Sequence, residues 1–236
     1  MRKLIFITIV LLSITFLALQ AEAVIFISGS PAAAGGGGNQ TIDIAANNDD
    51  GNIRSCQDTG SGPLQSSGDG SNRAEMGEFA QDFTDYGFYR FQLSSALPNG
   101  STITTAYVTL EAATTWSWTF TTGDHGTLHV FADNAADAAQ VSSADDCPES
   151  GTGVTVATAN VAWSPTVWTT DVQYQSPELK TIFQELVDDN GGMAQNAYVQ
   201  LWIGTNPVAS DPSMLHAYDE SHATGTVAQL YIEWTN

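Results

Sequence analysis

The chain has 236 residues, of which 26 are Asp or Glu and only 6 are Lys or Arg, so its formal net charge is −20 at pH 7. A surface this acidic repels nucleic acids and anionic membranes, which argues against both as partners. The length is sufficient for one large domain with its own hydrophobic core.

Residues 1–23 have the pattern of a cleaved secretory signal peptide. Arg2 and Lys3 precede an apolar run from Leu4 to Leu19, and Ala21-Glu22-Ala23 provides the small residues that a signal peptidase needs. The apolar run is shorter than the ~20 residues of a typical membrane-spanning helix. An uncleaved anchor is the alternative, but we expect a secreted or cell-surface protein that has no membrane contact after cleavage.

Residues 24–39 combine a short apolar strand with a flexible tether. Val24, Ile25, Phe26 and Ile27 favour a β-strand, and four glycines follow at positions 35–38. An exposed apolar strand on a tether can complete the sheet of a neighbouring copy, and such head-to-tail contacts build filaments. The alternatives are that the strand pairs with its own domain or that it is removed with the signal peptide.

Alternating apolar and polar residues indicate β-strands through residues 40–236, which we expect to form one domain. The alternation is found at 41–44, 89–93, 105–110, 116–120, 128–132, 154–158, 198–203 and 228–234. Residues 47–71 are polar and rich in glycine, which predicts a long loop. The pattern predicts an all-β fold, an antiparallel β-sandwich or jelly roll in which each sheet has one solvent-exposed face.

One short amphipathic helix interrupts this pattern. Its apolar side chains share one helical face, at positions Leu179, Ile182, Phe183, Leu186 and Val187. We expect Ser176 to cap the helix, Pro177 to occupy the first turn, and residues 190–192 to end it. Such a helix can close one open end of a β-sandwich.

Several phrases of the sequence, taken in order, resemble a known group of extracellular domains. They occur at residues 89–91 (Y-R-F), 97–103, 106–108, 158–163, 176–179, 217–219 and 230–233. Together they are similar to the DNRLRE and family-96 carbohydrate-binding-module group. The resemblance implies a jelly-roll module of the kind found on bacterial and archaeal surface proteins. Some members of the group bind polysaccharides, calcium is common in such folds, and most have no assigned activity.

Acidic turns and a pair of cysteines suggest two ways of stabilising such a fold. Ca²⁺ prefers oxygen ligands, and the candidate calcium ligands that we select are Asp133, Asn134, Asp137, Asp49 and Asp50. A solvated acidic surface is the alternative. In an exported protein, Cys56 and Cys147 are most simply explained by one disulfide.

Aromatic side chains are the candidate carbohydrate-binding residues. An aromatic ring can stack on a sugar ring, and Trp202, Trp168 and Tyr107 occupy strand or loop positions that we expect to be exposed. No histidine lies in a zinc motif or beside a nucleophile sequence, so we nominate no catalytic residue.

The sequence therefore predicts a secreted, non-catalytic, calcium-stabilised module that binds polysaccharide or a cell-surface partner. The first alternative is a filament or matrix subunit that assembles through the strand at 24–28. The second alternative is a polysaccharide-degrading enzyme.

Overall fold

The computed structural model describes residues 36–46, 48–54, 64–66, 73–78, 84–113, 127–143, 146–148, 154–165, 167–205, 214–218 and 225–236. All of them belong to the unit Gly35–Asn236. The predicted signal peptide and the strand Val24, Ile25, Phe26 and Ile27 lie outside the described residues. No helix in the described part of the chain is long and apolar enough to cross a membrane.

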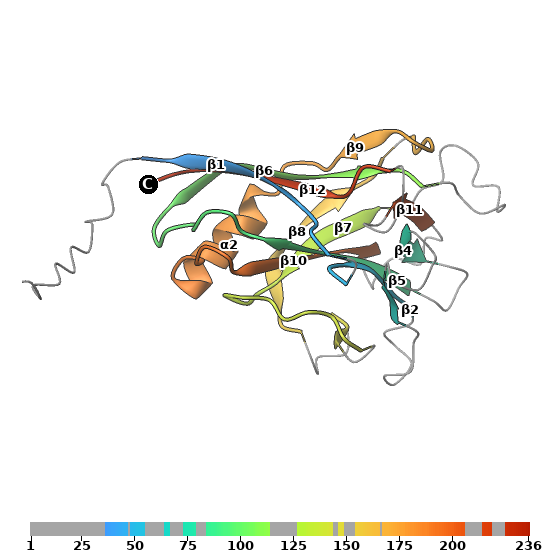
Figure 1. The fold of residues 1–236 in the computed structure, drawn as a ribbon, viewed down its shortest axis with the longest axis horizontal. Helices are drawn as coiled ribbons and strands as arrows, with labels where there is room; N and C mark the ends of the chain where they lie inside the picture. Colours follow the sequence, from blue (N-terminus) through green and yellow to red (C-terminus); the bar gives the residue numbers. More distant parts are fainter. Residues whose placement is uncertain are drawn as a thin grey trace, which may run out of the picture. The chain divides into compact units, whose positions relative to one another are not determined.

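Two antiparallel sheets form the two layers of a β-sandwich, as the alternating sequence predicted (Figure 1). The smaller sheet has the order β1 (Gly38–Asp43), β12 (Gln229–Thr235), β6 (Thr102–Glu111) and β9 (Gln173–Gln175). The larger sheet has the order β11 (Met214–Tyr218), β4 (Arg73–Glu78), β5 (Thr84–Gln92), β10 (Tyr198–Thr205), β7 (Leu128–Asp133) and β8 (Val156–Trp163). On β5 it also carries β2 (Asp50–Arg54), which pairs with β3 (Leu64–Ser66).

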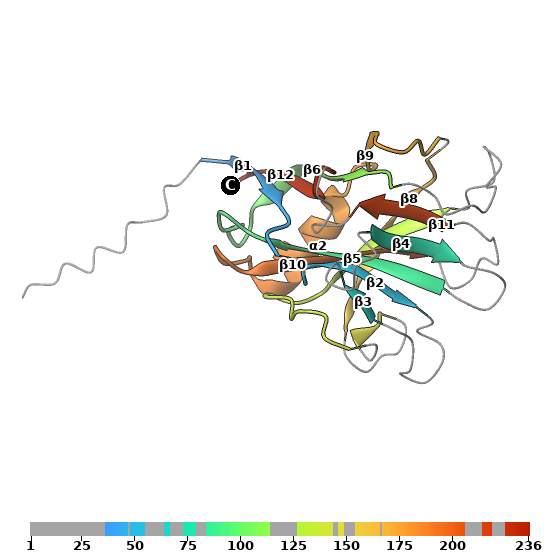
Figure 2. The ribbon, with the colours of Figure 1, turned by 45° about the vertical axis from the view of Figure 1, so that its right-hand side comes forward.

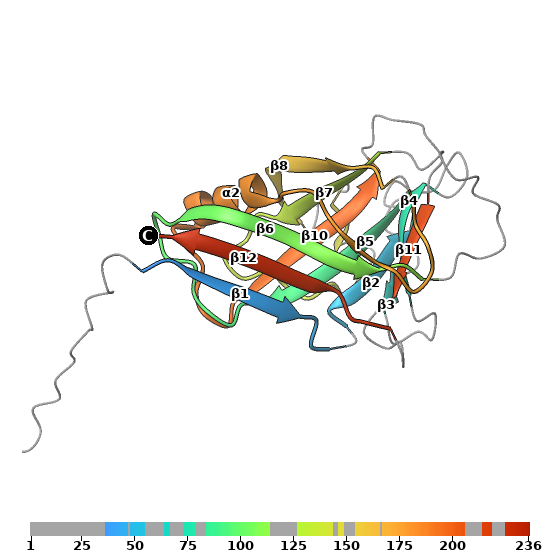
Figure 3. The same ribbon diagram turned by 90° about the horizontal axis from the view of Figure 1, so that it is seen from above.

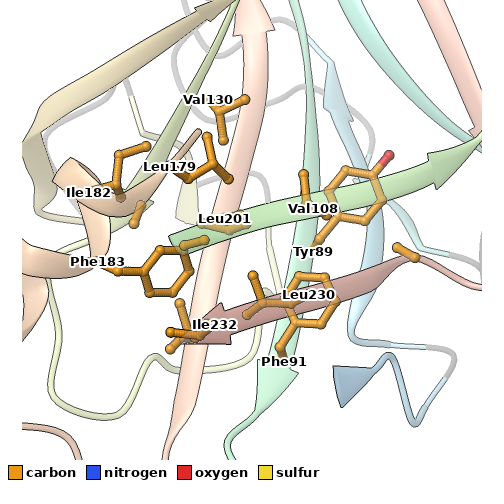
Figure 4. Close-up of a cluster of buried hydrophobic side chains, with 14 of the residues drawn as sticks. Tyr89, Phe91, Val108, Val130, Leu179, Ile182, Phe183, Leu201, Leu230 and Ile232 are labelled. Carbon is orange, nitrogen blue, oxygen red and sulfur yellow. The ribbon is translucent and has the colours of Figure 1, made fainter. Parts of the chain in front are cut away.

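The main hydrophobic core lies between the two sheets. Side chains at alternate strand positions point inward, because successive residues of a strand face opposite sides of a sheet. Figure 4 shows Phe183 of the helix beside Leu201 of β10, with Ile232 of β12 close by. All three are fully buried, so the predicted periodicity selected core residues correctly.

The helix α2 (Lys180–Asn190) lies between the layers at one end of the sandwich (Figures 1 and 2). It begins later than the sequence predicted, because residues 176–179 still run along β6. Ser176 N donates to Val108 O at 2.8 Å, and Leu179 N donates to Ala106 O at 2.7 Å. Ser176 and Pro177 therefore precede the helix, whereas Gly191, at φ 67°, ends it as predicted.

A second hydrophobic cluster covers the other face of the larger sheet. It contains the buried side chains of Ile53, Tyr86, Phe88, Val141, Cys147 and Trp202. Val141 and Cys147 come from the segment that follows β7, so this segment lies over β5 and β10. Cys147 is disulfide-bonded, and the chain's other cysteine, Cys56, lies outside the described residues.

Two boundaries differ from the sequence prediction. The predicted loop at 47–71 contains β2 and β3, whose polar residues concealed them. β1 begins at Gly38, inside the predicted 24–39 tether, because Gly38 and Asn39 pair with Trp234 and Glu233 of β12. The predicted strand at 116–120 lies outside the described residues.

Candidate carbohydrate-binding face

The outward side of the smaller sheet is an open face that no described segment covers, and we call it the tyrosine face. In Figure 3 its strands β1, β12 and β6 lie in front of the larger sheet. Burial alternates along each strand, so every second side chain is exposed or half-buried and belongs to this face. These side chains are Asn39, Thr41, Asp43, Thr105, Tyr107, Thr109, Glu111, Gln173, Gln175, Gln229, Tyr231 and Glu233.

Two tyrosines form the centre of this face. Tyr107 of β6 and Tyr231 of β12 are directly opposite each other in the antiparallel register. Their rings stack with centroids 5.0 Å apart and an interplanar angle of 18°. Thr41 of β1 is opposite Tyr231 on its other side, so the pair stands among small polar side chains. Stacking leaves each ring one face that its partner does not cover.

Carboxylates surround the tyrosine pair. Glu233 lies two residues from Tyr231 on the same face, and Asp43 accepts a 2.8 Å hydrogen bond from Gln229 Nε2. Partial desolvation raises the pKa of the Tyr231 phenol, and the charge of Glu233 and its hydrogen bond with Tyr231 add to the shift. The Tyr231 hydroxyl therefore remains a hydrogen-bond donor at neutral pH.

This arrangement suits the chemistry of a carbohydrate ligand. Aromatic faces pack against the apolar C–H surface of a sugar ring, while hydroxyl, amide and carboxylate groups bond its hydroxyls. An open sheet face also accommodates an extended chain, because none of the described residues closes over it. No Lys or Arg occurs in β1, β12, β6 or β9, so the face offers no positive charge to an anionic sugar.

Of the three aromatic residues predicted to bind carbohydrate, only Tyr107 lies on this face. The prediction that Trp202 is exposed is wrong, since its exposed fraction is 0%. It packs in the second cluster, where its ring lies 6.0 Å from that of Phe88. Period-two alternation places Trp202 away from the main core correctly, but the segment after β7 buries that side of the sheet as well.

Trp168 belongs to a different aromatic group, at the opposite edge of the smaller sheet from β1. Its ring stacks on that of Tyr174, with centroids 4.7 Å apart, and meets Trp163 edge-on at 5.9 Å. Trp168 is half-buried and packs against the main core. Its role in the described structure is therefore to close the space between β8 and β9.

Three of the five residues predicted to bind calcium form a salt bridge or a hydrogen bond with another residue of the protein. Asp49 forms a salt bridge with Arg90, and Asp137 Oδ1 accepts a 2.8 Å hydrogen bond from Tyr198 N. Asn134 Nδ2 donates to Asp189 Oδ2 at 2.7 Å. Asp50 is fully buried in β2.

Asp133, at the end of β7, is half-buried, and this burial raises its pKa to about 6. Within the described ranges, no three His, Cys, Asp or Glu side chains gather closely enough to hold a metal ion. Calcium binding therefore stays a prediction from composition and resemblance.

Tyr231 is the central residue of the face that sequence reasoning did not select. It alternates with the inward residues Leu230 and Ile232, so its outward position could have been inferred from periodicity. Its stacking on Tyr107 could not, because the register between β12 and β6 is a property of the folded sheet.

No known family model matches this chain, and no curated protein matches it. The resemblance to the DNRLRE and family-96 carbohydrate-binding-module group therefore stays a prediction.

Proposed function

We propose that this protein is a secreted, non-catalytic module that binds a polysaccharide across the tyrosine face. The observation that carries the proposal is the stacked pair Tyr107 and Tyr231, which is half-buried at the centre of the otherwise polar tyrosine face. A buried position would have explained two adjacent aromatic rings by core packing alone. Here both tyrosines are only partly buried, and the side chains around them on the face can form hydrogen bonds with hydroxyl groups.

The charge of the face favours a neutral polysaccharide as the ligand. Asp43, Glu111 and Glu233 are its charged residues, and all three are acidic. A uronate or sulfate group would meet like charge here and in the protein as a whole, whose net charge is −20. A neutral sugar chain has no such repulsion, and carboxylates are strong acceptors for its hydroxyl groups.

Affinity electrophoresis through gels that contain soluble polysaccharides tests the proposal. The panel includes neutral glucans, mannans and xylans, with a polyuronate for comparison. We expect retardation by at least one neutral polysaccharide, and roughly fivefold weaker binding for Tyr231→Ala and Tyr107→Ala, since an aromatic contact contributes about 1 kcal/mol. Reducing-end release by the same samples tests the enzymatic alternative, and we expect none.

Two further variants separate the face from general stability. Tyr231→Phe keeps the stacked ring and should retain most of the affinity. Tyr174→Ala removes a stacked tyrosine that lies outside the face and should leave the affinity unchanged. Absence of binding to every neutral polysaccharide, or equal binding by wild type and Tyr231→Ala, would contradict the proposal.

A further inference from the structure

One side of the sandwich is bordered by β8 and β9, and we call it the β8–β9 seam. β8 is the outermost strand of the larger sheet, and β9 is the outermost strand of the smaller one. Figure 3 shows β8 beyond β7, next to α2. The seam is therefore bordered by two strand edges and by the described residues of the loop that joins them, 164, 165 and 167–172.

The core is partly open along this seam. Among the described residues, the apolar side chains that pack against the main core while remaining partly exposed are Ala159, Val161, Trp168 and Tyr174. All four belong to β8, β9 or the loop between them. In the described part of the chain, the large apolar side chains that are exposed outright are Val167 at 49% and Val172 at 42% in this loop, and Val156 at 37% at the start of β8. Val167 and Val172 thus add exposed apolar surface beside the partly exposed core residues Trp168 and Tyr174, as is typical of an interaction surface.

The backbone of β8 adds a second feature of a docking site. Its eight residues, VATANVAW, contain no charge, although natural edge strands usually carry charges that prevent pairing with another chain. Glu185 of α2 occupies only the first part of the edge, where its two carboxylate oxygens accept the amides of Thr158 and Ala159 at 2.6 Å each. No described strand pairs with the outer edge of the remaining part, from Asn160 to Trp163.

We propose that the β8–β9 seam accepts residues 24–28 of a second copy of this chain as an added strand. The segment Val-Ile-Phe-Ile-Ser has no charge, a high β-propensity and alternate large side chains that could fill an apolar seam. Two copies that each carry a net charge of −20 repel one another. A contact between an uncharged strand and an uncharged edge adds least to this repulsion.

The position of β1 favours a neighbouring copy over the seam of the same copy. Gly38 pairs with Trp234, which pairs in turn with Ile103 near the start of β6. β9 pairs with the other end of β6, at Thr109 to Glu111, so Gly38 and β9 occupy diagonally opposite corners of the smaller sheet. The separation is about 27 Å, from roughly seven steps along β6 and three strand spacings. The ten residues from Ser28 to Gly38 span at most about 35 Å, which leaves little slack for a path around the sandwich. A contact between successive copies does not close on itself and therefore builds a filament.

The test uses two variants of the secreted chain. Phe26→Asp places a charge in the added strand and leaves the seam intact. Asn160→Lys/Ala162→Lys places two charges on the exposed side of β8 and leaves the added strand intact. Light scattering after size exclusion should show polymers for the wild type and monomers for each variant. An equimolar mixture of the two variants should form 1:1 dimers and nothing larger, because only one productive contact remains.

Matched controls carry the same charges at other positions. Ala34→Asp lies in the predicted tether, and Ala96→Lys/Asn99→Lys changes the same residue types at exposed positions outside the seam. Both should polymerise like the wild type. The proposal would be overturned if unmixed Phe26→Asp polymerised or if the wild type were monomeric. It would also be overturned if the mixed variants failed to dimerise. Because none of these outcomes measures sugar binding, they are independent of the function proposed for the tyrosine face.

Discussion

The Arg90 guanidinium donates from Nη1 to Asp49 Oδ1 at 2.8 Å, with exposed fractions of 13% and 6% for the two side chains. Its Nε donates to Ala138 O at 3.0 Å, and its guanidinium carbon lies 3.5 Å from the centroid of the Tyr198 ring. One basic residue thus joins β5, the segment before β2, the segment after β7 and β10. Because the chain has only six Lys and Arg residues, few side chains could replace Arg90 as the counter-ion of Asp49.

Arg90→Met should therefore destabilise the protein strongly. The substitution leaves Asp49 buried without its counter-ion, and breaking a buried ion pair in this way costs about 3–5 kcal/mol. Urea unfolding measures the change. Lys180→Met, which removes a positive charge from an exposed position, should alter the free energy of unfolding by less than about 0.5 kcal/mol. Equal effects of the two substitutions would show that only net charge matters.

Trp202→Ala should reduce stability rather than carbohydrate affinity. Removing a fully buried tryptophan leaves a cavity between β10 and the segment that carries Val141 and Cys147, at a cost of about 3–5 kcal/mol. Thermal unfolding followed by circular dichroism measures the loss. A variant that unfolds like the wild type but no longer binds polysaccharide would place the ligand at Trp202 instead of at the tyrosine face.

Asp133→Asn should stabilise the protein above pH 6 and have little effect near pH 4. Burial raises the pKa of Asp133 from 3.8 to about 6, so the folded state holds this proton more tightly than the unfolded state does. Its contribution to stability therefore falls as the pH rises from about 4 to 6, and the cost of the buried charge persists above that window. Allowing for solvent screening, we expect a gain of about 1–2 kcal/mol at pH 7.5. Melting temperatures across pH 4–8 test this, with Asp43→Asn as a control for net charge; a pH-independent gain would be contradictory.

Glu185→Gln should weaken the attachment of α2 to β8. The carboxylate accepts two backbone amides where the β7–β8 register is irregular, and the glutamine side chain replaces one acceptor with a donor. We expect a loss of about 1–3 kcal/mol. Hydrogen exchange should accelerate at Thr158 and Ala159, whereas Thr181→Ala, exposed on the same helix, should leave both amides protected. Unchanged exchange in Glu185→Gln would rule out this role.

Sequence periodicity predicted the strands that have one wet face. In β6, for example, Ala106, Val108 and Leu110 are buried and the residues between them point outward, as the alternation requires. The same reasoning failed for β10, because the segment after β7 buries its second face. Alternation reports which side chains share a face, and it does not report whether another part of the chain lies over that face.

Polar composition concealed β2 for a different reason. Asp50 and Asn52 are fully buried, and Asn52 Nδ2 donates to Asp85 Oδ1 at 3.4 Å. Polar residues such as these suggest a loop when the groups with which they form buried hydrogen bonds are unknown. The tyrosine pair shows a similar limit, since either tyrosine could be assigned to an outward position but their contact depends on strand order and register.

The central claim, that a polysaccharide binds across the tyrosine face, is tested most directly by NMR mapping of the bound ligand. The ligand is the neutral polysaccharide that retards the protein most in affinity electrophoresis. The account predicts that the largest changes in backbone amide shifts fall at Tyr107 on β6 and Tyr231 on β12, with smaller changes at Thr41 on β1. Shifts concentrated on β10 around Trp202, or on the aromatic group at Trp168, would contradict it.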